Sequence, residues 1–176
     1  MADIRQRVDE DRGLLKKIQN FVPGFRGYRR REDLRDADRM LRSQIAGHLG
    51  SVRKDLESSR MLISAGWNSK ELELLGGLIS QLKKLEGQVA HAETGYSGFV
   101  ADIEVKEDQI FRLYDYDASM IDMIGQMRSS GDAIRSSLAA KDSARAVQDI
   151  MAMRTLTDDF ESQFDRRLRV ITGTEV

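Results

Sequence analysis

Cysteine is absent from the 176-residue chain, and histidine occurs only twice. These counts exclude a disulfide scaffold, a cysteine-based zinc site, thiol catalysis and a histidine-rich metal centre. The longest apolar run, residues 74–79, is far shorter than the roughly 20 residues that cross a bilayer. We therefore expect no transmembrane segment, no metal and no cofactor.

Neither sign of charge is in large excess, because the formal net charge is −1. The distribution is uneven, however: residues 1–42 carry a net charge of +4, and the acidic side chains concentrate in residues 102–122. This pattern predicts a basic end and an acidic patch. The N-terminus has charged residues where a signal peptide would be apolar, so we expect a cytoplasmic protein.

Apolar residues recur with the 3.6-residue period of helices almost throughout the chain. The pattern predicts helices over residues 3–20, 29–64, 68–93, 107–140 and 143–172, whereas residues 99–106 alternate weakly and stay open between strand, loop and helix. Asn68 and Glu71 have the spacing of a capping box, and Asp142 is a good N-cap for the last helix. The predicted apolar stripes include Leu72, Leu168 and Ile171.

The pattern predicts an all-α fold: an elongated antiparallel up-down bundle of about four long helices with coiled-coil-like packing, preceded by a shorter helix. Helices joined by short loops become antiparallel neighbours. Residues 1–22 are interpreted as an N-terminal amphipathic helix, and residues 23–176 as a single helical-bundle domain.

Asp117 interrupts the apolar stripe that contains Leu113 and Ile124. A carboxylate on a core face needs a partner or must stay neutral, and an arginine or a tyrosine hydroxyl from another helix would suffice. We predict a buried structural pair, with a functional carboxylate and a position at the solvent boundary as alternatives.

A basic cluster occupies residues 26–42, next to Gly24, Gly27 and the start of a predicted helix. Free N–H groups and a positive dipole end at such a place favour anions. Acidic residues are interleaved, so a solvated face with ion pairs is the main alternative. The candidate residues for binding an anion or a partner are Arg26, Arg29, Arg30, Arg31 and Arg35.

No phosphate-binding loop, nucleophile elbow or calcium loop is present in the sequence. His48 and His91 could form a metal site with Asp117, but two surface histidines are the simpler interpretation. An enzyme that uses Asp117 with Tyr114 or Tyr116 is the weakest hypothesis. We therefore predict no catalytic residues and no enzymatic activity.

Two segments carry glycines beside aromatic residues: Pro23-Gly-Phe-Arg-Gly-Tyr28 and Gly95-Tyr-Ser-Gly-Phe99. Together with Leu113-Tyr-Asp-Tyr-Asp117, they resemble a family of small prokaryotic all-helical proteins that has no assigned activity. The resemblance implies a helical fold and brings no catalytic residue. It also suggests membrane-scaffold proteins of the stomatin or band-7 type as partners.

These features favour a non-enzymatic interaction or adaptor protein, a helical bundle that docks on protein partners, membrane-associated scaffold proteins among them. Self-association and peripheral membrane association fit the same hypothesis, whereas nucleic acid fits a nearly neutral chain poorly. The alternative is binding of an anionic ligand, a phospholipid headgroup or nucleic acid, through the basic end at residues 26–42.

Overall fold

The computed structural model describes residues 2–28, 31–63, 69–92 and 107–172, with only the backbone for residues 2–8, 11, 31–33 and 107. Every regular element in these ranges is helical, which confirms the predicted all-α fold. The helices are α1 (Ala2–Phe21), α2 (Arg31–Ser59), α3 (Ser69–His91), α5 (Glu107–Ala139) and α6 (Ser143–Thr172), with a 3-10 turn η1 (Arg60–Leu62) after α2.

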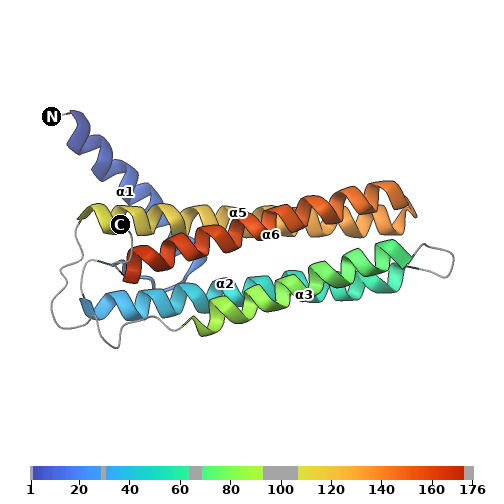
Figure 1. The fold of residues 1–176 in the computed structure, drawn as a ribbon. Coiled ribbons are helices and arrows are strands. Elements are labelled where there is room, and N and C mark those ends of the chain that lie inside the picture. The colour runs from blue at the N-terminus through green and yellow to red at the C-terminus, as the bar shows by residue number, and fades with distance from the viewer. Residues whose placement is uncertain (1, 29–30, 64–68, 93–106, 173–176) are drawn as a thin grey trace.

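The four long helices form an elongated bundle of two helical hairpins, α2–α3 and α5–α6 (Figure 1). Helix α3 also packs against α6, and α2 packs against α5. Each long helix runs in the opposite direction to the one before it, but α3 and α5 lie diagonally opposite each other and are not neighbours. Two pairs of neighbouring helices are therefore parallel, α2 with α5 and α3 with α6, whereas the pairs α2–α3 and α5–α6 are antiparallel (Figure 1).

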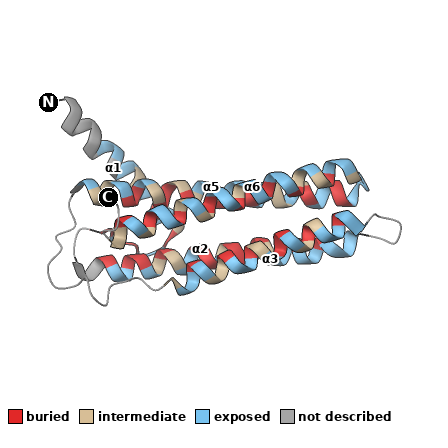
Figure 2. Ribbon diagram, in the orientation of Figure 1, coloured by how far each residue is buried: buried red, intermediate tan, exposed pale blue. Residues whose placement is uncertain are grey.

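Buried residues recur at spacings of three, four or seven residues along α3, α5 and α6 and form an inward stripe on each helix (Figure 2). In α3 and α5 some directly adjacent residues, such as Ile79 and Ala118, are buried beside the stripe. Such spacing keeps one face of a helix directed at its neighbours over many turns. The buried residues of α3 are Glu71, Leu75, Leu78, Ile79, Leu82, Leu85 and Val89. Those of α6 are Ala146, Ile150, Met153, Thr157, Phe160, Phe164, Arg167 and Val170.

Several residues of the predicted apolar stripes, Leu72, Leu168 and Ile171 among them, lie further from the core than expected. Leu72 is 41% exposed, and Leu168 and Ile171 are only partly buried. The preceding residues Glu71, Arg167 and Val170 are buried instead. At Leu72 and Leu168 the prediction was wrong because it followed apolar side chains rather than the regular spacing, so it passed over a polar residue on the inner face.

The helix ends agree with the sequence in part. Asp142 caps α6 as predicted, since its Oδ1 accepts the Arg145 backbone N–H at 3.0 Å. Helix α2 ends at Ser59 and not at residue 64 as predicted. The hydroxyls of Ser58 and Ser59 donate hydrogen bonds to backbone carbonyls one turn back, which weakens the helix at this end. Asn68 of the expected capping box and residues 99–106 lie outside the described residues.

Helix α1 crosses α5 at an angle, and its N-terminal half extends away from the bundle (Figure 1). Its C-terminal half docks through Ile18, which is fully buried, with Leu14, Leu15 and Phe21 partly buried beside it. An exposed ion pair from Lys17 to Asp122 of α5 adds to this contact. The N-terminal helix is thus an accessory element and not a fifth member of the bundle.

Within the described ranges, no helix has the combination of length and apolar character that is needed to traverse a bilayer.

Candidate functional site

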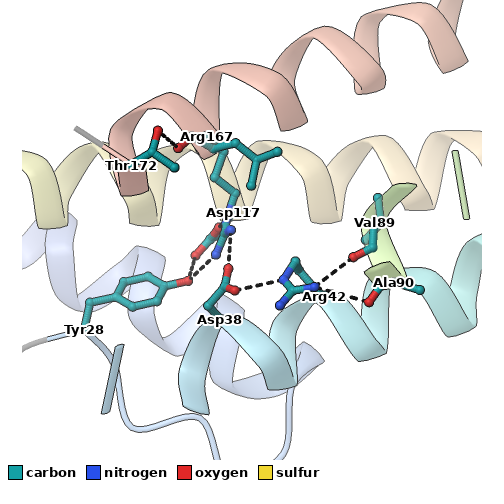
Figure 3. Close-up of polar contacts among 9 residues, drawn as sticks. Tyr28, Asp38, Arg42, Val89, Ala90, Asp117, Arg167 and Thr172 are labelled. Atoms are coloured by element: carbon teal, nitrogen blue, oxygen red, sulfur yellow. Dashed lines mark hydrogen bonds and ion pairs between the residues drawn. The ribbon is translucent and has the colours of Figure 1, made fainter. Parts of the chain in front are cut away.

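A cluster of buried polar side chains lies near one end of the bundle, at the start of α2 and the end of α6 (Figure 3). We call it the charge cluster. It consists of Tyr28, Asp38, Arg42, Asp117 and Arg167. Asp38, Asp117 and Arg167 have no solvent-exposed surface. Two arginines face two aspartates, so the cluster is balanced in charge.

Arg167 of α6 is the centre of the charge cluster (Figure 3). Its Nε donates to Asp117 Oδ1 at 2.5 Å, and its Nη1 donates to Asp38 Oδ1 at 2.5 Å. Its Nη2 donates to the Tyr28 hydroxyl at 2.9 Å. The planar guanidinium can satisfy three acceptors in fixed directions, which a lysine ammonium does less well. One side chain thereby joins α2, α5, α6 and the turn after α1.

Arg42 extends the charge cluster to α3. Its Nε donates to Asp38 Oδ2 at 2.8 Å. Its Nη1 donates to the backbone carbonyls of Val89 and Ala90, at 3.2 and 3.3 Å. These carbonyls belong to the last turn of α3, where helical partners are missing and a cation is favourable. Arg42 therefore acts as a side-chain cap on α3.

The turn after α1 positions Tyr28 in the charge cluster. Gly27 has φ +93°, a conformation that favours glycine, and a Cβ there would lie 2.5 Å from the Tyr114 hydroxyl. That hydroxyl accepts the Tyr28 N–H at 3.2 Å, and the two tyrosine rings stack 5.3 Å apart. The Tyr28 hydroxyl donates to Asp117 Oδ2. Phe25 and Tyr28 of the first glycine-aromatic segment, and Tyr114 and Asp117 of the segment in α5, are thus part of the internal packing.

Both oxygens of Asp117 accept hydrogen bonds, one from Tyr28 and one from Arg167, and this arrangement favours the ionised carboxylate. Burial raises the pKa of the Asp117 carboxyl, against the opposing effect of Arg167. Burial and the nearby Asp117 also raise the pKa of Tyr28 well above its ordinary value, so its hydroxyl keeps the proton it donates. Burial opposes the charge of Arg167, but Asp117, Tyr28 and Asp38 hold its pKa well above the usual range.

This geometry decides between the interpretations of Asp117. The residue lies in the core with an arginine and a tyrosine as partners, and neither of its oxygens is left for a substrate. Tyr114 bonds to the backbone of the turn. An acid–base role for these groups would require an accessible atom within reach of the substrate. The charge cluster therefore holds helices together.

Arg167 and Asp38 were not identified from the sequence as site residues, whereas Arg42 was included only in the basic cluster and Tyr28 only in the first glycine-aromatic segment. A signal was present for two of them. Arg167 follows Phe160 and Phe164 in the spacing of the α6 core, and Asp38 lies between Leu34 and Leu41 in the same way. Charged residues at core positions of three different helices, with Arg167 opposite in sign to Asp38 and Asp117, were the indication of a buried cluster.

The basic residues proposed for ligand binding are only partly gathered. Arg26 is exposed, and it borders a pocket of about 300 Å³ that is also lined by Gly24, Asp36, Ala37 and Met40. Arg35 is exposed and has an interaction partner. The side chains of Arg29, Arg30 and Arg31 lie outside the described residues. A carboxylate thus lies in the same pocket as the described arginine.

The two histidines and Asp117 do not form a metal site. Asp117 is fully engaged, and Nδ1 of His48 faces the guanidinium of Arg128. No group of three or more metal-ligating side chains occurs among the residues that the structure describes.

His48 should titrate below its ordinary pKa of 6.5, because burial and the Arg128 cation both disfavour its charged form. We expect the pKa of His48 to rise in Arg128→Gln but to stay below 6.5, since burial is the larger cause. The ring C–H resonances followed by NMR against pH measure this, with His91→Gln for assignment. Because the unfolded chain binds the proton more tightly, stability should fall as the pH drops below 6.5. An unchanged pKa of His48 in Arg128→Gln would contradict the contact between His48 and Arg128.

No protein-family model, curated protein or solved structure matches this chain, so the candidate function rests on the arrangement of its residues.

Proposed function

We propose that the protein is a non-enzymatic interaction protein, a helical bundle that docks on protein partners. The observation that supports this most is α1, whose N-terminal half extends away from the bundle (Figure 1). Among the described side chains of α1, only Ile18 is fully buried. A protruding helix offers surface to another macromolecule, in contrast to the concave sites that hold small substrates.

The use of the buried charges also supports this proposal. Asp38, Asp117 and Arg167 form a closed set of hydrogen bonds between helices. Ionisable groups with perturbed pKa values in enzymes usually face a cleft, whereas Asp117 and Arg167 have no exposed surface. Membrane-associated scaffold proteins are the partner class to test first. A cytoplasmic location, self-association and coiled-coil-like packing of the bundle helices belong to the same proposal.

Two contacts weigh against the alternative of anion binding at residues 26–42. Arg42 is committed to Asp38 and to the end of α3. Asp36 lies in the pocket beside Arg26 and would repel an anion there. The alternative predicts steep loss of binding with added salt, which separates it from docking on a protein.

The proposal is tested by purifying the tagged protein from its native cells, with membranes solubilised and nuclease added, and measuring the stoichiometry of what copurifies. We expect a discrete protein at a fixed ratio. Its recovery should fall when the exposed α1 residues Arg12 and Lys16 are both changed to Glu. The matched control changes Arg135 and Arg154, which are exposed on the bundle itself, to Glu.

Two results would contradict the proposal. One is that the protein remains alone after purification under all solubilisation conditions. The other is that the purified protein converts a defined substrate and loses this activity in Asp117→Asn. If both charge-reversed variants lost the partner, binding would depend on the overall charge of the protein and not on α1. That result would contradict the role given to α1.

A further inference from the structure

We propose that α1 and the turn after it form a detachable plug, and that release of this plug opens one end of the bundle. The plug is defined as residues 14–28. It holds the rest of the molecule in two different ways: α1 is held weakly, and the turn is held by the charge cluster. The inference concerns this internal coupling and does not depend on the proposed function.

The hold on α1 is weak. Helix α1 packs chiefly on α5, and the partly buried Leu14, Leu15 and Phe21 surround a single fully buried residue, Ile18. In the ion pair between Lys17 of α1 and Asp122 of α5, both side chains are more than a third exposed. Exposed ion pairs contribute little to stability. Elements with few buried contacts are the ones that open locally while the remainder stays folded.

The turn, in contrast, is part of the core. Val22, Phe25 and Tyr28 are each at most 2% exposed, and the Phe25 ring meets the Tyr28 ring edge-on at 5.3 Å. Beyond these rings lie Asp117 and Arg167. The turn is therefore both the end of the α1 segment and the cover of the charge cluster (Figure 3).

The two parts are coupled through Tyr28. Departure of the plug would remove the hydroxyl that donates to Asp117 and accepts from Arg167, and it would admit water to both charges. Buried charges gain hydration when water reaches them. Hydration of Asp117 and Arg167 in turn loosens the contacts among α2, α5 and α6. By linkage, loosening of this end must equally favour release of α1.

Hydrogen exchange of the full-length protein, measured by mass spectrometry, tests the coupling. In Tyr28→Phe we expect peptides from residues 14–21 and 165–172 to exchange about ten- to hundredfold faster, as the loss of one or two buried hydrogen bonds implies. Peptides from residues 50–59 and 143–153, at the opposite end, should be unchanged. The matched control is Tyr116→Phe, which removes a hydroxyl from α5 outside the charge cluster.

A second variant, Ile18→Ala, tests the coupling from the α1 end. Ile18→Ala weakens the docking of α1 and leaves every residue of the charge cluster in place. If α1 and the turn act as a plug, hydrogen exchange should become faster not only in residues 14–21 but also in residues 165–172. Faster exchange confined to residues 14–21 would overturn the inference, because α1 would then detach without opening the bundle. A uniform increase over all helices would also overturn it, because only global stability would have changed.

Discussion

Replacing Arg167 with methionine is expected to lower the free energy of unfolding by about 3–5 kcal/mol. The substitution leaves Asp38 and Asp117 buried without the guanidinium that bonds to both. Removing one member of a buried ion pair costs more than the pair contributes, because the remaining charge is neither solvated nor compensated. The loss is large against a total stability of about 5–15 kcal/mol. Urea denaturation followed by circular dichroism measures it.

The matched control is Arg166→Met, one residue earlier on the exposed face of α6. It should change stability by no more than about 0.5 kcal/mol. Arg167→Lys should lie between the two, because an ammonium keeps the charge but does not reproduce the planar fork. If Arg167→Met and Arg166→Met were equally stable, the charge cluster would have no role in holding the helices together.

Replacing Gly27 with alanine is expected to cost about 2–4 kcal/mol, the sum of backbone strain and a lost buried hydrogen bond. Gly27 has φ +93°, and the new Cβ would lie 2.5 Å from the Tyr114 hydroxyl. Tyr114 must then move, which leaves the Tyr28 N–H without its acceptor. The opposite sign is expected for Gly77→Ala in α3, where a new Cβ would meet nothing within 4 Å beyond the local helix backbone and alanine favours the helix by about 0.5–1 kcal/mol.

A double-mutant cycle separates the two causes at Gly27. In a Tyr114→Phe background the clashing oxygen is gone, and the next atoms lie 3.7 Å from the Cβ position. Gly27→Ala should therefore cost less in that background than in the natural chain. An identical cost in both backgrounds would show that backbone strain alone is responsible, and that the close approach to Tyr114 has no energetic effect.

The sequence predicts the number, type and approximate bounds of the helices, because helical periodicity is strong from one element to the next. It does not predict the diagonal relation of α3 and α5. The apolar stripes show that each helix has an inner face, but stripes of leucine and isoleucine do not specify which helices become neighbours. That choice depends on contacts between residues far apart in the chain, such as Arg167 with Asp38.

The candidate site was only partly predictable for a related reason. Asp117 can be identified because it interrupts an apolar stripe. Arg167 is harder to identify, because the next residue, Leu168, is apolar and was assigned to the stripe in its place. Thr157 and Glu71 are two further polar residues on the inner faces of α6 and α3. Regular spacing identifies such positions better than hydrophobicity does. Tyr28 has no periodic signal, since a turn positions it.

The diagonal connection has a consequence for the rates of folding. Contacts within the α2–α3 and α5–α6 hairpins join residues that are near in sequence, whereas Tyr28 and Asp117 are 89 residues apart, and Asp38 and Arg167 are 129 apart. Pairs with such long separations have the larger loop-closure entropy and tend to form late. The charge cluster should therefore be largely absent from the transition state. Its loss would accelerate unfolding and leave the refolding rate nearly unchanged, so the cluster sets how long the native bundle persists.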